Sequence, residues 1–174
     1  MNKDKLEKGV EMILDGLGVD KRLEAFEETP RRVAKSLMEL CSGLDADLEK
    51  EVFKGVFQAP TIKGQIPTAI NNIHAWGICP HHLLPVILKV DVMYIPYGKV
   101  LGLSKVHRLV QALSHRPVLQ EELTSDIANI MHERLKCGVQ VRVAGTHMCM
   151  VARGVKASPD AQVITEAVVG NISA

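Results

Sequence analysis

The chain has 174 residues, with 21 Lys and Arg against 20 Asp and Glu, and a formal net charge of +1 at pH 7. This balance excludes a protein that coats nucleic acid or an anionic membrane through a large positive surface. Phe, Trp and Tyr make up only 3% of the residues, which argues against an aromatic platform for stacking nucleic-acid bases. The 47% hydrophobic and 24% charged residues are typical of one globular domain with an aliphatic core.

The first fifty residues are predicted to be helical. Apolar residues recur every three or four positions between residues 6 and 17, which indicates one amphipathic helix. Thr29 and Pro30 predict the start of a second helix, because an N-cap hydroxyl is followed by Pro in the first turn. Arg32 and Lys35 lie three positions apart on this helix. They form either a solvated basic face or part of an anion site.

The rest of the chain alternates between strands and helices. Residues 53–78 show no regular pattern, and we expect an irregular segment there. After it we predict a strand over 88–96, a helix capped by Ser104, a helix over 119–135, a strand over 139–153 and a strand over 163–168. This order favours an α+β domain with an antiparallel sheet. We expect residues 1–50 to be an N-terminal helical segment and residues 51–174 to be the main domain.

The four cysteines, Cys41, Cys79, Cys137 and Cys149, are an even number, but their context does not suit a disulfide scaffold. The N-terminus has no apolar signal core, and no apolar run approaches the roughly 20 residues that span a bilayer. We therefore expect a cytoplasmic protein that does not bind membranes, with cysteines that serve as ligands, catalysts or core residues instead of forming disulfides. Cys41 lies on an apolar helix stripe and Cys137 at a helix end, so both are interpreted as packing residues.

A cluster of metal-ligand residues stands out in two places. Cys79 and His82 form a Cys-x-x-His spacing in a loop before a strand, and His81 lies between them. His147 and Cys149 lie two apart, on one face of the predicted strand. A structural zinc would use four of these ligands, whereas a catalytic zinc would use three and leave one position open. A buried Cys on an apolar strand is also often a plain core residue.

A second group of residues suggests an anion site. Lys105 and Arg108 lie three apart near the start of the helix that begins at Ser104, where free backbone N–H groups and the helix dipole favour negative charge. Arg153 ends the predicted strand of His147 and Cys149, on the same face. An anion bound there would lie close to a metal held by the cysteines. An exposed basic helix end is the competing interpretation.

Several blocks in order along the chain resemble the GTP cyclohydrolase I family of zinc enzymes. They are Thr29-Pro30-Arg31-Arg32-Val33-Ala34-Lys35, Cys79-Pro80-His81-His82-Leu83-Leu84-Pro85, Val100 to Arg108, Arg116 to Thr124, and Thr146 to Val155. The resemblance implies the tunnelling fold: a four-stranded antiparallel sheet with two helices between the middle strands, plus N-terminal helices. It also implies a homo-oligomer in which pentameric barrels stack into a decamer, with active sites between subunits.

The resemblance also implies a reaction and a set of site residues. The reaction is zinc-dependent hydrolysis of GTP at C8, with release of formate and rearrangement to 7,8-dihydroneopterin triphosphate. The zinc ligands would be Cys79, His82 and Cys149, the proton-handling groups His81 and His147, the guanine contacts Gln120 and Glu121, and the triphosphate contacts Arg32, Lys35, Ser104, Lys105, Arg108 and Arg153. Pro80 departs from the family, which usually has Glu at that place.

Two alternatives remain beside this interpretation. One is a diverged tunnelling-fold relative that acts on a related purine or pterin, such as an epimerase of dihydroneopterin triphosphate. The presence of both cysteines and both site histidines argues against an epimerase, whose chemistry needs no zinc. The other alternative is a non-catalytic oligomer with structural zinc, which would leave Lys105, Arg108 and Glu121 without a purpose.

Overall fold

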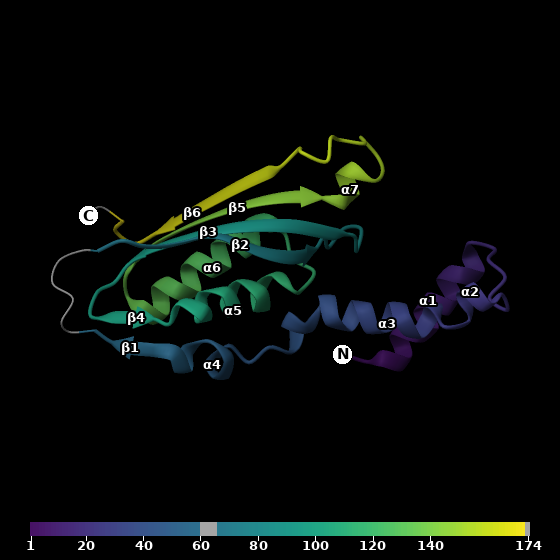
Figure 1. The fold of residues 1–174 in the computed structure, drawn as a ribbon, viewed down its shortest axis with the longest axis horizontal. Helices are drawn as coiled ribbons and strands as arrows, with labels where there is room; N and C mark the ends of the chain where they lie inside the picture. Colours follow the sequence, from purple (N-terminus) through teal and green to yellow (C-terminus); the bar gives the residue numbers. More distant parts are fainter. Residues whose placement is uncertain (60–65, 173–174) are drawn as a thin grey trace.

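A computed structural model describes residues 1–59 and 66–172 of the protein. At its centre is a four-stranded antiparallel sheet in the order β2-β3-β5-β6, with α5 and α6 packed on one face (Figure 1). The bounds are β2 (Thr68–Ile78), β3 (Pro85–Ile95), β5 (Gly138–His147), β6 (Val163–Val169), α5 (Leu103–Ser114) and α6 (Gln120–Leu135). Both helices stand between the two middle strands in the chain. The predicted α+β class and this helix placement are therefore confirmed.

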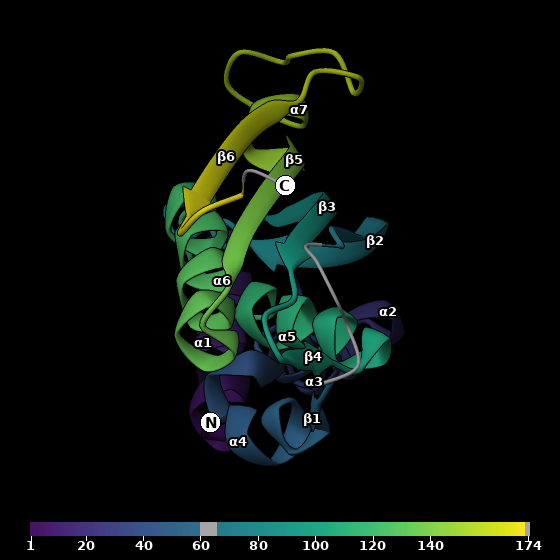
Figure 2. The same cartoon turned by 90° about the vertical axis from the view of Figure 1, so that its left-hand side faces the viewer.

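The core lies between the sheet and the two helices (Figure 2). Strand alternation turns Leu88, Val90, Val92 and Tyr94 of β3 inward, as predicted, and each is at most 2% exposed. Helix α5 packs beneath β2, whereas α6 packs beneath β5 and β6. This packing fixes the first residues of β3 and the last residues of β5 relative to the start of α6. The candidate site residues gather in this region.

An arm of helices extends from this body (Figure 1). It consists of α1 (Lys3–Gly16), α2 (Glu24–Glu27) and α3 (Thr29–Leu40), with α1 packed along α3, so both predicted N-terminal helices are confirmed. The predicted cap of the second helix is wrong, because Glu28 holds the N-cap position and the Thr29 hydroxyl donates to the Ala25 carbonyl. The chain returns to the body through η1 (Ser42–Asp45), α4 (Leu48–Glu51), η2 (Phe53–Gly55) and β1 (Val56–Gln58), which pairs with β4 (Lys99–Leu101). The division at residue 50 stays a prediction. Among the described residues, no helix is both long and apolar enough to cross a membrane.

The expectation of an irregular segment over 53–78 is wrong, although residues 60–65 of it lie outside the described residues. Thr68–Ile78 forms the long strand β2, antiparallel to β3. Its alternation is interrupted by a bulge between Ile70 and Ile73, where Asn72 has a φ of 60° and its N–H donates to Asp91. The one extra residue shifts the period-two pattern by which a strand is recognised in a sequence.

The strand predicted over 139–153 is too long. Strand β5 ends at His147, and Met148–Val151 forms the short helix α7. The reason is a lack of partners: β3 begins at Pro85, and the pairing with β6 begins only at Gly145 opposite Val163. Without neighbours to bond, the backbone beyond His147 satisfies its own polar groups in a helical turn. Cys149 and Arg153 therefore do not lie on a strand face.

The predicted cap of α5 is also wrong. The helix begins at Leu103 with Gly102 at the N-cap, so Ser104 lies inside the first turn and makes no capping hydrogen bond. In contrast, α6 ends as predicted from the glycine that follows it: Lys136 adopts a left-handed conformation, and Gly138 opens β5. All four cysteines are free thiols, and Cys41 and Cys137 are buried packing residues, as predicted.

Candidate metal centre

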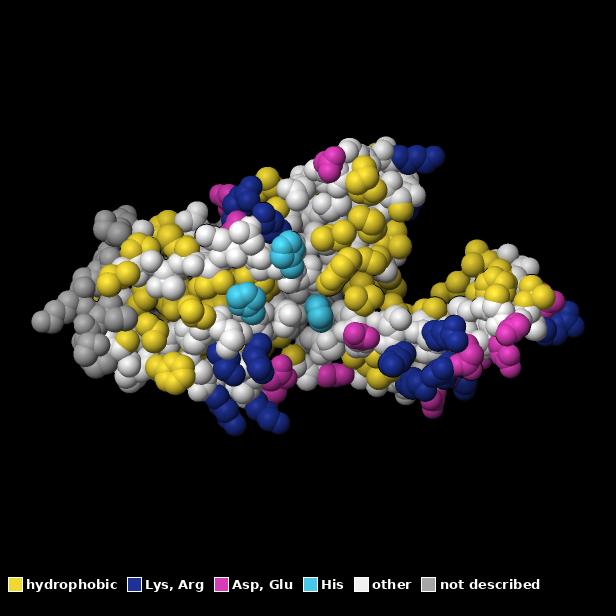
Figure 3. Space-filling model, in the orientation of Figure 1, with side chains coloured by type: hydrophobic (Ala, Val, Ile, Leu, Met, Phe, Trp, Pro, Cys, Tyr) yellow, Lys and Arg dark blue, Asp and Glu magenta, His cyan; other side chains and the backbone are white. Residues whose placement is uncertain are grey.

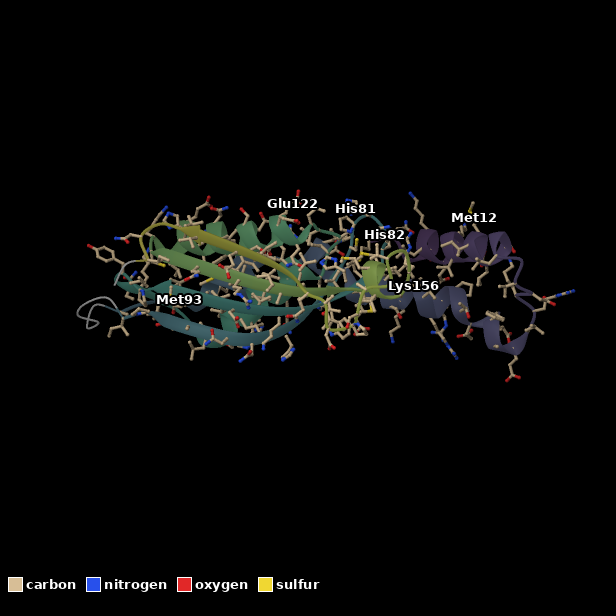
Figure 4. The ribbon with its side chains drawn as sticks, turned by 90° about the horizontal axis from the view of Figure 1, so that it is seen from above. Met12, His81, His82, Met93, Glu122 and Lys156 are labelled. Carbon is tan, nitrogen blue, oxygen red and sulfur yellow. The ribbon has the colours of Figure 1, made fainter. Side chains whose placement is uncertain are left out.

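Three predicted ligands meet at the end of the body that carries α7. The ligand atoms of Cys79, His82 and Cys149 all lie within 4.8 Å of one another, close enough to hold a metal ion. Cys79 Sγ is 3.7 Å from His82 Nδ1. Figure 4 shows His81 and His82 together beside α7. Thus Cys149 reaches the group from a helical turn, not from the predicted strand.

The turn over residues 79–84 brings Cys79 and His82 together. The Cys79 carbonyl accepts from the N–H of His82 at 3.4 Å and of Leu83 at 2.9 Å, while the Cys79 N–H donates to Leu84 at 2.9 Å. Pro80 occupies the second position of this turn, where its fixed φ is favourable. Leu83 closes the turn with a φ of 53°. The backbone hydrogen bonds of this turn therefore set the Cys-x-x-His geometry.

The charges around the three ligands suit a divalent cation. Burial raises the pKa of the Cys149 thiol, and the hydrogen bond with Cys79 raises it further. Two adjacent thiols resist losing both protons unless a positive charge neutralises them. Arg153 donates from Nη1 to His82 Nε2 at 2.8 Å, which leaves Nδ1 facing the cysteine side. Two sulfurs and one imidazole form a soft donor set typical of zinc.

His147 lies two residues before Cys149, with a different set of contacts. Its Nε2 is 2.9 Å from Oε1 of Gln120 at the start of α6. Burial lowers the pKa of His147, and the nearby carboxylate of Glu121 opposes this shift. Gln120 and Glu121, the two residues expected to contact guanine, therefore lie beside His147. Gln120 is buried, whereas Glu121 is exposed and free to contact a ligand.

The predicted triphosphate residues do not gather at this centre, apart from Arg153. Ser104, Lys105 and Arg108 lie in the first half of α5, which begins beside β4, away from α7 (Figure 1). Lys105 Nζ donates to the Glu51 carbonyl at 2.7 Å. Arg108 lines a separate cavity of about 480 Å³ between α5 and η1. Ser104 and Lys105 lie in the first turn of α5, and Arg108 lies near the middle of this 12-residue helix, which is about 18 Å long.

Arg32 and Lys35 form a third location. Both are exposed on α3 in the arm. The structure therefore brings together Cys79, His82, Cys149, Arg153, His147, Gln120 and Glu121, and His81 lies in the turn of Cys79 and His82. The cationic residues of α5 and those of α3 lie apart from this centre.

Two residues near His147 were missed from the sequence. Gly145 leaves room for the Gln120 side chain, because a Cβ there would lie 2.2 Å from Gln120 Oε1. Thr165 of β6 contacts the Gln120 amide at 3.2 Å. A glycine inside a strand is a sequence signal of close approach by another group, so Gly145 was detectable in principle. Thr165 carries no such signal.

The chain is similar to several known proteins. The sequence model described as GTP cyclohydrolase I matches residues 6–174. GTP cyclohydrolase 1 of Desulforamulus reducens is 43% identical over 168 residues, covering 95% of this chain and 87% of that protein. GTP cyclohydrolase 1 of Bacillus subtilis is 42% identical over 172 residues, covering 98% and 88%. A crystal structure of an archaeosine synthase QueF-Like in the apo form has a TM-score of 0.49 and 20% identity, covering 64% of this chain and 99% of that one.

Proposed function

The chain belongs to the GTP cyclohydrolase I family, and from this premise we propose that it hydrolyses GTP at C8, releases formate and forms 7,8-dihydroneopterin triphosphate. The observation that carries the proposal is the meeting of Cys79, His82 and Cys149, with His147 two residues away. Three protein ligands leave one position open for a reactant, whereas a structural zinc site is normally closed by four.

Cys79, His82 and Cys149 are the residues that would hold the zinc. When bound, the metal would supply Lewis-acid chemistry and lower the pKa of a water molecule at the open position. The chain supports this role with a preformed turn, since the backbone of residues 79–84 already directs two of the ligands to one point. Free thiols at these positions suit the cytoplasm, where cysteines stay reduced.

His147 and His81 would handle the protons. Opening the guanine imidazole ring requires a proton on a ring nitrogen, and a histidine that is neutral near pH 7 can take up and return one. Burial lowers the pKa of His147, which favours that neutral form. His81 is exposed in the metal-binding turn and can exchange protons with solvent. Glu121 would accept hydrogen bonds from the guanine N–H groups, with Gln120 beside it.

The triphosphate would be bound by residues from more than one copy of the chain. Ser104, Lys105 and Arg108 lie at one end of α5, Arg153 at the other, and Arg32 and Lys35 on the arm. Charge-assisted hydrogen bonds from such cations suit a tetra-anionic ligand. Within one copy these groups stand at three separate places, which favours a homo-oligomer with active sites between subunits.

The surface of the chain supports the same assembly. Apolar side chains gather in the hollow between the arm and the α7 end of the body (Figure 3). An apolar cavity of about 390 Å³ there is lined by residues of α1, α3 and the metal-binding turn. Among the described strands, β2 and β6 pair on one side only. We propose tunnelling-fold barrels, in which the edges of five copies join and two rings stack.

The test is direct. Purified, zinc-loaded protein is incubated with GTP, and the products are examined for formate and, after oxidation, for a fluorescent neopterin. Both products are expected, and removal of zinc with a chelator should abolish both. Conversion of dihydroneopterin triphosphate to an epimer without zinc would support the epimerase instead. The absence of turnover by protein with a full zinc content would refute the proposed function.

A further inference from the structure

The orientation of the Gln120 amide is determined by its surroundings. Gln120 is 5% exposed, and its Nε2 lies 3.2 Å from the Val143 carbonyl, 2.9 Å from the Val163 carbonyl and 3.2 Å from Thr165 Oγ1. Carbonyl oxygens can only accept, so the amide NH₂ group must face them. Oε1 therefore points the other way, toward His147.

The hydroxyl groups nearby fix the same direction. Thr124 donates its only hydroxyl hydrogen to the main-chain carbonyl of Gln120 at 2.7 Å. Thr165 Oγ1, 2.6 Å from Thr124 Oγ1, must then be the donor in that contact. Its lone pairs remain to accept from the Gln120 NH₂ group. The two hydrogens of the NH₂ group are shared among these three acceptors, and a reversed amide would place Oε1 against the two carbonyl oxygens.

This orientation fixes the hydrogen on His147. Gln120 Oε1 can only accept, so the Nε2 of His147, 2.9 Å away, must carry the hydrogen and donate it. In the neutral ring Nδ1 is then the nitrogen with the free lone pair. No other hydrogen bond to the His147 ring is found within the described part of the chain.

Gly145 makes this contact possible. It lies on β5 two residues before His147, and a Cβ there would meet Gln120 Oε1 at 2.2 Å and His147 Nε2 at 3.3 Å. A side chain at this position would occupy the space between the two groups. The strand therefore provides a gap in which the hydrogen bond forms.

We propose that Gln120 is a positioning residue that holds His147 as the Nε2–H tautomer and directs its Nδ1 to the reacting atoms, with Gly145 and Thr165 in support. The inference rests on the proposed function for its catalytic consequence. It revises the role expected for Gln120, which acts through His147 and not through contact with guanine.

The test uses Gln120→Met, which keeps the volume of the side chain and removes its hydrogen bonds. We expect kcat for GTP to fall at least about tenfold to a hundredfold, the range found when the hydrogen-bond partner of a metal-binding histidine is lost, with KM within about twofold. Zinc content should be unchanged. The matched control is Gln140→Met, a Gln on the opposite face of β5, which should behave as the unmodified protein.

The decisive readout does not depend on turnover. Zinc-loaded protein with ¹⁵N-labelled histidine is examined by solid-state NMR, and the His147 signal is identified by its loss in His147→Asn. A single Nε2–H tautomer is expected in the unmodified protein and in Gln140→Met. Gln120→Met should give a mixture of tautomers. Gly145→Ala should give the same mixture by displacing Oε1 without removing any polar group.

Two results would overturn the proposal. One is a His147 tautomer that is mixed in the unmodified protein or unaltered in Gln120→Met. The other is a rise in KM at constant kcat, which would assign Gln120 to direct contact with the substrate. Failure of the unmodified protein to turn over GTP would refute the proposed function alone, because the tautomer is measured without GTP.

Discussion

The groups of candidate site residues beside the two ends of α5 differ in how far one chain completes them. At the α7 end, Cys79, His82, Cys149 and Arg153 contact one another within one chain, and His147 is held in place beside them. At the β4 end, Lys105 and Arg108 have neighbours of their own chain but nothing that resembles a finished site. The difference teaches that one chain is enough to gather the metal ligands, whereas under the proposed function the triphosphate contacts would need a second copy.

The largest effect should come from removing a ligand at the complete end. Cys149→Ala is expected to lose zinc and turnover together, because two remaining ligands cannot hold the ion in competition with water. Metal analysis and the formate assay measure the two losses. Cys41→Ala, a buried cysteine in the arm, should keep its zinc. Full zinc occupancy in Cys149→Ala would break the assignment of the ligands.

The next effect separates chemistry from metal binding at the same end. His147→Ala should retain zinc and lose about 10²- to 10⁴-fold in kcat, the usual contribution of a general acid–base group. His74→Ala, which removes an exposed histidine on β2, serves as the control. Loss of zinc from His147→Ala would show that this residue is a ligand and that the centre was misassigned.

A third experiment tests the incomplete end. Arg108→Ala should raise KM for GTP about tenfold to a hundredfold, since a charge-assisted hydrogen bond contributes about 1.5–3 kcal/mol. This variant is then refolded in equal amounts with Cys149→Ala, and the mixed oligomers are assayed well below KM. Roughly a quarter of the sites should combine an intact Cys149 from one chain with an intact Arg108 from another, so roughly a quarter of full activity should return.

The control for that experiment is a mixture of His147→Ala and Cys149→Ala. Both changes lie at the complete end of one chain, so no site in the mixture should be restored. Equal recovery in the two mixtures would contradict the proposal that one chain supplies the metal site and another chain supplies the triphosphate contacts.

The smallest effect concerns the turn of the metal centre. Pro80→Ala should weaken zinc binding about twofold to fivefold, because the metal-free turn gains about 0.4–1 kcal/mol of conformational freedom. Competition with a coloured chelator measures the change. Pro159→Ala, in an exposed turn, is the matched control. Unchanged affinity in Pro80→Ala would show that hydrogen bonds alone hold the turn.

Much of the fold and of the metal centre could be predicted from the sequence, because several of their features depend on residues that are close together in the chain. The Cys79–His82 spacing is local, so a single turn determines it. The alternation of Leu88 to Tyr94 identified β3 because one face of that strand is fully buried. Strand β2 escaped recognition because the one extra residue of the bulge at Asn72 breaks its period. The end of β5 depends on where its neighbours stop, which a single segment does not encode.

The surroundings of His147 show the same limit more clearly. Gln120 and Thr165 lie 27 and 18 positions away in numbering, and only the packing of α6 beneath β5 and β6 brings Gln120 to the imidazole and Thr165 to Gln120. The motif identified Gln120 as important, whereas its actual partners emerged only from the fold.

The position of Thr165 on an edge strand links the accuracy of folding to the reaction. Thr165 pairs with Val143, and its side chain points to α6 because of that pairing. If β6 slipped by one residue, Thr165 would turn to the opposite face, and Ile164 or Glu166 would stand beside Gln120. In such a misaligned sheet the Gln120 amide would lose its Thr165 partner, and Ala167 and Val169 would leave the core at the same time. The alignment of β6 therefore links the packing of the sheet to the contact that orients His147.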